Sequence, residues 1–232
     1  MMTKTALITG ASRGLGLALA QALALEGWQL IITGRGEVAL MTAADELSAV
    51  TTITAVSGDV SDANHRQQLA KAAKQLGGLD VVINNASLLG PSPQPALLDY
   101  DLPTLARVFE VNVLAPVGVL QAVHAQLQTN ATIINLSSDA AVEPYAGWGG
   151  YGASKAALEQ LTAVFAAENR DLRVYWVDPG DMRTQMHQEA FPGEDIRDRP
   201  LPEAAVPGFL ALVKGELPNG RYQAQQMAQE VA

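Results

Sequence analysis

The sequence predicts a doubly wound α/β fold, in which helices cover both faces of a parallel β-sheet. Short runs rich in β-branched residues alternate with longer, alanine-rich amphipathic segments along the chain. Runs such as TALIT (5–9) and VVIN (81–84) are largely apolar, as expected of strands that are buried on both faces. This combination is typical of a sheet between two helical layers.

The expected elements follow one another without a repeat, a low-complexity tract or a linker, so we expect a single domain over residues 1–232. The expected strands are KTALIT (4–9), QLIIT (29–33), TTITAVS (51–57), LDVVIN (79–84), ATIINLS (131–137), LRVYWV (172–177) and RYQAQ (221–225). The expected helices cover residues 14–26, 37–49, 62–76, 102–128, 152–168 and 203–214.

Composition excludes several classes of function. The 232 residues include no cysteine, which excludes disulfides, thiolate catalysis and cysteine-bound zinc and suits a reducing cytoplasm. The N-terminus lacks a signal-peptide pattern, and no apolar run reaches the roughly 18 residues that span a bilayer, so we expect no membrane partner. A net charge of −9 argues against nucleic-acid binding. We expect no metal site.

In such sheets, ligands bind beyond the carboxyl ends of the strands. The segment at the end of the first expected strand is TGASRGLG (9–16). Gly10 permits a tight turn, while Gly14 and Gly16 would let the backbone approach a pyrophosphate at the start of a helix. The alternative is an ordinary glycine turn before a helix.

The same segment also matches the nucleophile elbow of hydrolases, G-x-S-x-G, with Ser12 as the nucleophile. The candidate bases are His65, His124 and His187. An elbow serine normally follows several strands, whereas Ser12 follows the first, so an accidental match is favoured.

The second expected strand ends at Gly34 and Arg35, where a dinucleotide-binding fold usually has an acidic residue for the ribose hydroxyls. Without that carboxylate, and with Arg13 close to Arg35, the charge pattern favours NADPH over NADH. The alternative is that both arginines belong to a solvated surface.

The third and fourth strand ends are also polar. Asp59 could bind the adenine amino group, or else Asp59 or Ser61 could cap the next helix. NNAS (84–87) has small residues where the backbone would pass beneath a ribose, although an Asx-type turn would use the same residues.

Pro116 lies inside the helix expected over 102–128. Because proline has no N–H, the carbonyl group of Asn112 loses its helical partner. We hypothesise that this carbonyl holds a water molecule. A proline kink filled by packing is the alternative.

Tyr151 and Lys155 lie four residues apart, so both would occupy one face of a helix. None of the other tyrosines precedes a lysine at this spacing. Ser138 ends the fifth strand, thirteen residues before Tyr151, although it could equally be a turn residue. After the sixth strand Pro179 and Gly180 force a turn, and the polar, proline-containing segment 184–206 is expected to form a substrate lid.

In this order, TGASRGLG, NNA, Asn112, Ser138, Tyr151-x-x-x-Lys155 and PGDMRT resemble the short-chain dehydrogenase/reductase family, from Thr9 to about Thr184. The resemblance implies a Rossmann fold with seven parallel strands in the order 3-2-1-4-5-6-7. It also implies an NAD(P) cofactor, a carbonyl or alcohol substrate, and a homodimer or homotetramer. The catalytic tetrad would be Asn112, Ser138, Tyr151 and Lys155.

The chemistry of this tetrad follows from hydride transfer, which leaves an alkoxide that needs a proton. Tyr151 would supply it, with the Lys155 ammonium lowering the tyrosine pKa from about 10 towards neutrality. The resemblance implies that Lys155 also binds the nicotinamide ribose, that Ser138 orients the substrate oxygen, and that Asn112 holds a relay water.

Cofactor contacts are expected from seventeen positions that these motifs supply: Gly10, Ser12, Arg13, Gly14, Leu15, Gly16, Arg35, Asp59, Val60, Asn85, Ala86, Tyr151, Lys155, Pro179, Gly180, Met182 and Thr184. Two residues depart from the family pattern. Ser87 replaces the commoner glycine, and Met182 replaces a small β-branched residue whose backbone binds the carboxamide.

The glycines around the tyrosine, Gly149, Gly150 and Gly152, are expected to leave space for nicotinamide and substrate. Candidate residues for the substrate wall are aromatic or methionine side chains, which could also belong to core or lid packing: Tyr145, Trp148, Met186 and Phe191. The sequence thus predicts an NADPH-dependent carbonyl reductase. A catalytically silent NADP(H)-binding sensor is the alternative.

Overall fold

A computed structural model describes residues 3–215 and 217–231 of the chain. Its seven-stranded sheet has the order β3-β2-β1-β4-β5-β6-β7, and each neighbouring pair is parallel, so the predicted strand order is confirmed. The strands are β1 (Thr5–Thr9), β2 (Gln29–Gly34), β3 (Ile53–Ser57), β4 (Leu79–Asn84), β5 (Leu127–Leu136), β6 (Arg173–Asp178) and β7 (Gly220–Gln223).

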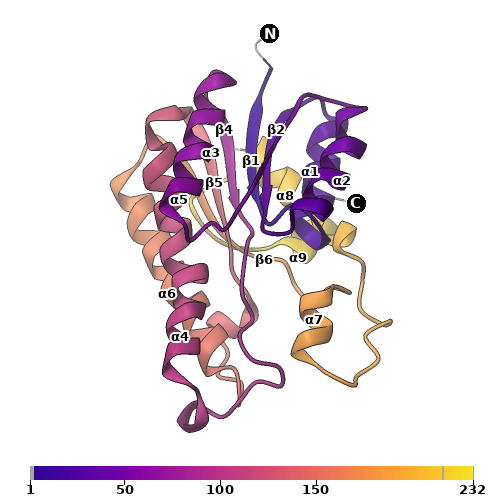
Figure 1. Ribbon diagram of the computed structural model, residues 1–232, viewed down its shortest axis with the longest axis vertical. Coiled ribbons are helices and arrows are strands. Elements are labelled where there is room, and N and C mark those ends of the chain that lie inside the picture. The colour runs from indigo at the N-terminus through magenta and orange to yellow at the C-terminus, as the bar shows by residue number, and fades with distance from the viewer. Residues whose placement is uncertain (1–2, 216, 232) are drawn as a thin grey trace.

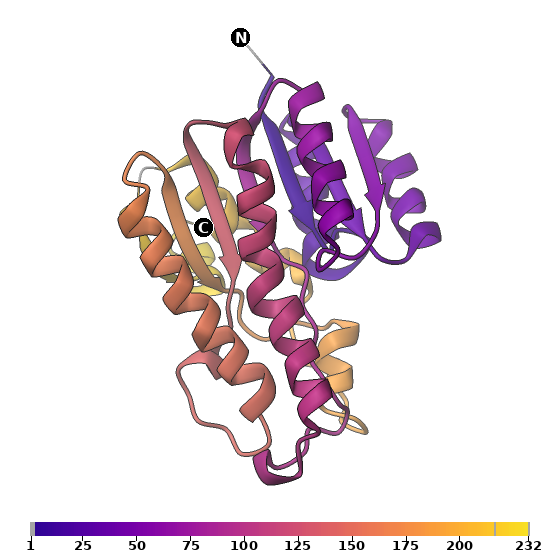
Figure 2. The same cartoon turned by 60° about the vertical axis from the view of Figure 1, so that its left-hand side comes forward.

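Helices cover both faces of this sheet (Figures 1 and 2). One face carries α1 (Gly14–Leu25), α2 (Glu37–Ser48) and α8 (Val206–Lys214), with α9 (Ala224–Val231) following β7. The other face carries α3 (Ala63–Gln75), α5 (Ala115–Val123) and α6 (Gly149–Glu168), while α4 (Leu102–Phe109) precedes α5. The short helix α7 (Gln185–Ala190) lies beyond the strand ends (Figure 1).

The sheet has a hydrophobic core on each face, because successive side chains along a strand point to opposite faces. On β1, Ala6 and Ile8 belong to the cluster with α1, α2 and α8, whereas Leu7 belongs to the cluster with α3 and α5. All three side chains are fully buried. Because successive strand side chains point to opposite faces, an apolar run is what this position requires.

The helix expected over 102–128 contains a π-helical turn at Glu110–Leu114 between α4 and α5. The N–H of Ala115 donates to the Glu110 carbonyl oxygen, five residues back, just before Pro116, which has no N–H to donate. The predicted irregularity is therefore present here, and Asn112 lies within it. The proposed water on the Asn112 carbonyl stays a prediction.

Segment Leu102–Gln126 is, among the described residues, long and apolar enough by composition to cross a membrane. In this fold 56% of its most apolar stretch is buried, because α5 packs against the sheet. Burial in a core accounts for its composition.

Element boundaries differ from expectation at several places; α8, for example, begins at Val206 rather than at residue 203. β5 begins at Leu127 rather than at residue 131, since Gln128, Thr129 and Asn130 are polar and exposed and do not show a strand pattern. α6 begins at Gly149 rather than at residue 152. β7 ends at Gln223, where α9 begins.

Candidate active site

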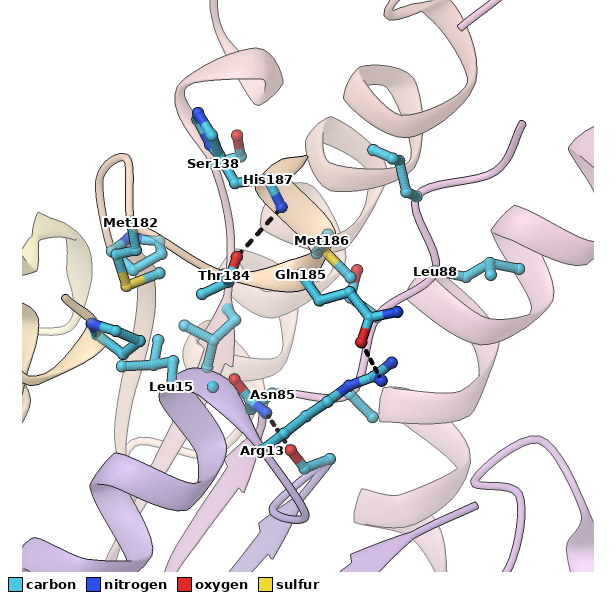
Figure 3. A pocket seen from close by; sticks show the side chains of 18 of the residues that line it. Arg13, Leu15, Asn85, Leu88, Ser138, Met182, Thr184, Gln185, Met186 and His187 are labelled. Atoms are coloured by element: carbon cyan, nitrogen blue, oxygen red, sulfur yellow. Dashed lines mark hydrogen bonds between the residues drawn. The ribbon is translucent and has the colours of Figure 1, made fainter. Parts of the chain in front are cut away.

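A cavity of about 1380 Å³ opens at the carboxyl ends of the strands. All of the residues expected to contact the cofactor line it except Gly16, and of the tetrad Ser138, Tyr151 and Lys155 line it. Asn112 is fully buried behind the wall. Figure 3 shows the cavity with the glycine turn below and α7 above.

The glycine turn between β1 and α1 is tight. Gly10 and Gly14 have φ values of +66° and +57°, which favour glycine. A Cβ on Gly16 would lie 2.4 Å from the Gly10 carbonyl oxygen and 2.5 Å from Asn85 Nδ2. Gly16 thus supports the turn from behind, which is why it does not line the cavity.

The N-terminus of α1 has the properties of an anion site. Arg13 occupies the N-cap without a side-chain capping bond, and Ser12, Arg13, Gly14 and Leu15 all line the cavity. The first backbone N–H groups of a helix lack intrahelical acceptors and carry a partial positive charge. A phosphate group fits this position.

Asn85 ties the end of β4 to the glycine turn (Figure 3). Its Nδ2 donates to the carbonyl oxygens of Thr9 at 2.9 Å and Gly10 at 3.1 Å. Thr9 Oγ1 accepts from the N–H groups of Asn85 and Ala86, both at 3.0 Å. The NNAS segment therefore braces the turn, rather than forming the Asx-type turn considered as the alternative.

Two exposed arginines lie at the cavity, near the end of β2. Arg13 donates to Gln185 Oε1 at 2.5 Å, which links the glycine turn to α7 (Figure 3). Arg35 also lines the cavity. A Cβ on Gly34 would lie 3.2 Å from Ser12 Oγ, so an acidic side chain has little room there.

Asp59 does not cap α3, because Asp62 accepts from the N–H groups of Asn64 and His65. The capping alternative for Asp59 and Ser61 is therefore wrong. Asp59 instead accepts from Ser61 Oγ at 2.7 Å and from Arg107 at 2.5 Å. Burial raises the pKa of Asp59, but these partners outweigh it and hold the pKa below its ordinary value.

Tyr151 and Lys155 are buried on one face of α6, with exposed fractions of 8% and 2%. Lys155 Nζ donates to the Leu136 carbonyl oxygen at 2.8 Å and lies 5.4 Å from the centre of the Tyr151 ring. Burial lowers the pKa of Lys155 to about 7. The helix thus places the pair as its spacing predicts.

The expected lowering of the tyrosine pKa is wrong for the protein without nucleotide. Burial raises the pKa of Tyr151 to about 12, and a hydrogen bond with the Ser87 hydroxyl opposes this only in part. The reason is that the same cavity wall removes water from both side chains and disfavours both charged forms. The charges of a bound dinucleotide would change this balance.

Ser138 lies at the end of β5, where Oγ donates to Asp139 Oδ1 at 2.8 Å. It also accepts from the N–H of Ala140 at 3.2 Å, so it begins a short 3₁₀ turn. Ser138 is thus a turn residue, as the alternative considered, and it lines the same cavity as Tyr151.

The Asn112 side chain is fully hydrogen bonded. Oδ1 accepts from Ser87 Oγ at 3.1 Å and from the N–H of Leu88 at 2.7 Å, while Nδ2 donates to the Leu88 carbonyl and to Ser154 Oγ at 3.0 Å. Ser154 in turn donates to the Tyr151 carbonyl. Asn112 therefore joins the β4 loop to α6, the helix that carries Tyr151 and Lys155, a role that its sequence context did not indicate.

The glycines near Tyr151 serve a different purpose from the one expected. None of the three lines the cavity. A Cβ on Gly150 would lie 2.5 Å from the Tyr100 ring, and one on Gly152 would lie 2.5 Å from the Ala140 carbonyl oxygen. A Cβ on Gly149 would meet Leu97 at 2.9 Å. These glycines permit close packing of α6, and leave no space for a ligand.

The expected wall residues all line the cavity: Tyr145, Trp148, Met186 and Phe191. The Trp148 ring lies 5.9 Å from that of Tyr151 and 5.7 Å from that of Phe191, between centres. His187 stacks on Phe191 at 4.9 Å and also lines the cavity. Sequence reasoning missed His187 as a wall residue, because the short helix α7 that presents it has no distinct pattern.

The chain matches a known protein family. The sequence model described as short chain dehydrogenase matches residues 4–195. A benzil reductase of Saccharomyces cerevisiae is 32% identical over 219 residues, covering 90% of this chain and 81% of the relative. Sepiapterin reductase of Mus musculus is 33% identical over 198 residues, covering 79% and 76%.

Solved structures agree with this match. A short chain dehydrogenase from Escherichia coli, complexed with NADPH, has a TM-score of 0.87 at 31% identity and covers 96% of both chains. An alcohol dehydrogenase from Thermococcus sibiricus, complexed with 5-hydroxy-NADP, has a TM-score of 0.85 at 28% identity and covers 95% of both chains.

Proposed function

This chain belongs to the short-chain dehydrogenase family and is therefore an NAD(P)-dependent oxidoreductase, and we propose that it is an NADPH-dependent carbonyl reductase with Tyr151 as general acid. The observation that carries this proposal is the arrangement of Ser138, Tyr151 and Lys155 on the same cavity as the glycine turn. Nucleotide and substrate can then share one cavity.

The chain's own residues fit the nucleotide. The uncapped N-terminus of α1, the turn supported by Gly16, and two arginines suit a phosphorylated dinucleotide. Arg13 and Arg35 would hold the 2′-phosphate, and Pro179, Gly180, Met182 and Thr184 would lie along the nicotinamide. When bound, the reduced nicotinamide supplies the hydride.

The proton comes from Tyr151. Its hydroxyl would donate to the substrate oxygen, which Ser138 Oγ would orient by a second hydrogen bond. Nearby negative charge favours the protonated lysine, so an anionic nucleotide beside Lys155 would raise its pKa above the value of about 7 set by burial. The charged lysine would then favour loss of the Tyr151 proton. Asn112 would hold the relay water.

The walls favour an apolar, aromatic carbonyl substrate. Trp148, Phe191, Met186 and Tyr145 line the same cavity as Tyr151 and supply large apolar surfaces. The relatives named for reduction of benzil and of sepiapterin support this choice, because both names denote ring-containing carbonyl compounds.

The proposal also includes the domain organisation, the location and the oligomeric state of the protein. We expect a single domain with a lid over 184–206, a cytoplasmic location, and a homodimer or homotetramer. The lid segment contains α7, which carries Met186 and lies over the cavity (Figure 3). Size-exclusion chromatography with light scattering measures the oligomeric state.

The test is NADPH oxidation against aromatic aldehydes, ketones, diketones and pterins, with wild type and Tyr151→Phe. We expect the substitution to lower kcat by about 10³-fold, since it removes the proton donor, while the Kd for NADPH changes little. Tyr222→Phe is the matched control because Tyr222 does not line the cavity.

Unchanged turnover in Tyr151→Phe would contradict the assignment of the acid. NADPH binding without turnover of any panel member by the wild type would instead support a silent sensor. Retention of all four polar tetrad residues favours the enzyme.

A further inference from the structure

A cluster of charged side chains from β6, β7 and α6 lies beside the carboxyl ends of β5 and β6, outside the tetrad. Arg221 of β7 donates from Nε to Glu159 Oε1 at 2.9 Å and from Nη2 to Asp178 Oδ2 at 3.4 Å. The side chains of Arg221, Glu159 and Asp178 are only 25%, 13% and 6% exposed. This is an ion-pair network largely withdrawn from water.

The same guanidinium reaches the catalytic segment. Arg221 Nη2 donates to the backbone carbonyl oxygen of Ser138 at 3.1 Å. The preceding residue is held as well, because Ser137 Oγ donates to Glu159 Oε1 at 2.5 Å. Glu159 lies one turn beyond Lys155 on α6. One guanidinium therefore connects the end of β5 to the helix that carries the tyrosine and lysine.

Asp178 extends the connection to the turn after β6. Its Oδ1 accepts from the N–H of Gly180 at 3.0 Å, which fixes the Pro179–Gly180 turn. Pro179 and Gly180 line the cavity. The network thus links three segments of the cavity wall through Arg221.

Stability of the sheet alone does not require these charges. Replacing a buried ion pair by well-packed apolar side chains is often neutral or stabilising, because desolvation offsets the attraction. The contact between Arg221 and the Ser138 backbone suggests another role for this ion-pair network. A displacement of about 1 Å in a group that orients substrate can cost about 10²-fold in rate, and Arg221 holds the peptide of the residue that would orient it.

We propose that Arg221 is a positioning residue that acts through the Ser138 backbone to hold the serine hydroxyl in place for the substrate oxygen. This inference rests on the proposed function, since it assigns Ser138 a role in turnover. Glu159 and Asp178 fix the guanidinium, and through it the relative positions of β5, β6 and α6.

The test is a double-variant cycle of Arg221→Met and Ser138→Ala, read out as kcat for NADPH-dependent reduction of the best panel substrate. Arg221→Met alone is expected to lower kcat by 10- to 100-fold with little change in the Kd for NADPH. On the Ser138→Ala background, where no hydroxyl remains to be oriented, it should lower the residual kcat by less than about twofold. Arg221→Lys, which keeps a charged donor, should recover part of the wild-type kcat.

Arg173→Met is the matched control. Arg173 also donates to backbone carbonyls, those of Asn130 and Gly215, but from the beginning of β6 at the opposite end of the sheet. We expect a lower Tm with kcat retained. If Arg221→Met does not fold, the same cycle is measured with Arg221→Lys and with Glu159→Gln.

If Arg221→Met lowered kcat by the same factor in the wild type and in Ser138→Ala, the positioning role of Arg221 would be overturned. The proposed function would then remain intact. Absence of turnover in the wild type would overturn both. Thermal unfolding of each variant separates a loss of rate from a loss of folded protein.

Discussion

In the proposed function, selection of the nucleotide would depend on three residues at the end of β2 and the start of α1. Gly34 supplies no carboxylate that would repel a 2′-phosphate, and a Cβ there would lie 3.2 Å from Ser12 Oγ, so Ser12 would have to shift slightly to admit a side chain. Arg13 and Arg35 are exposed at the same cavity and bring two positive charges. Charge-assisted hydrogen bonds to phosphate are the strongest that these side chains form.

Arg35→Asp should therefore reverse the preference for NADPH. We expect kcat/KM for NADPH to fall by roughly 10- to 100-fold, because a bidentate donor is replaced by a repelling charge. The ratio of kcat/KM for NADPH to kcat/KM for NADH should fall with it. Initial rates with both nucleotides measure this. Arg170→Asp makes the same charge change on the exposed surface away from the cavity. A wild type that prefers NADH would show that the charge argument is wrong.

Spacing along the sequence predicted the positions of some site residues but not the contacts of others. Tyr151 and Lys155 are four residues apart on a helix, so their common face follows from local geometry. The hydrogen bonds of Asn112 could not be predicted, because its partners Leu88 and Ser154 come from distant segments. The purpose of Gly150 likewise depends on Tyr100, some fifty residues earlier.

The turn between β1 and α1 is the element proposed to bind the phosphates of the nucleotide. Its backbone is held between Gly16 on one side and Asn85 on the other. A side chain at position 16 has no space unless the turn moves.

Gly16→Ala should distort this turn. We expect a loss of about 1–3 kcal/mol in the free energy of unfolding, the usual cost of overpacking, together with weaker NADPH binding. Thermal unfolding and fluorescence titration measure the two effects. Gly220→Ala is a suitable control, since a Cβ there meets its neighbours at 3.7 Å or more. Unaltered affinity and Tm in Gly16→Ala would show that the turn is less constrained than described.

Boundaries of elements were less predictable than their existence. Residues 128–130 of β5 are polar and exposed, and they lie where the register between β4 and β5 shifts. The π-helical turn in front of Pro116 was indicated by proline chemistry, although its form was not. Helix α7 is short and lies in a segment rich in charge and proline, so its sequence pattern is weak.

For the whole molecule, burial of Tyr151 and Lys155 connects folding to pH. The pKa of Lys155 is about 7 in the folded protein and about 10.5 in the unfolded chain, so between these values the unfolded chain binds one more proton. This contribution makes the folded state more stable as pH rises from about 7 to 10.5. Tyr151, with its pKa raised to about 12, acts oppositely above pH 10, where the unfolded chain loses its proton first.

Chemical denaturation of the nucleotide-free protein at several pH values tests this prediction. Relative to Lys155→Met, the wild type should gain a few kcal/mol of unfolding free energy between pH 7 and 10.5. Lys71→Met removes a lysine from the exposed surface and controls for general charge effects. Parallel pH curves for wild type and Lys155→Met would contradict burial of an uncharged lysine.

The overall architecture was largely predictable because alternation of apolar runs and amphipathic segments is a local signal repeated along the chain. The strand order was not contained in that alternation, and came from the resemblance of several motifs to one family. Their common position at strand ends is what a doubly wound sheet produces, since the carboxyl ends of its strands meet at one edge.

In the proposed function, the hydrogen bond between Arg13 and Gln185 would have a kinetic consequence. It joins the glycine turn to α7, and the segment that contains α7 includes both Thr184 and the substrate walls Met186 and Phe191. A dinucleotide lying under this segment would be covered once a substrate fills the space between it and the walls. Turnover would then follow a compulsory order, in which the dinucleotide enters first and leaves last.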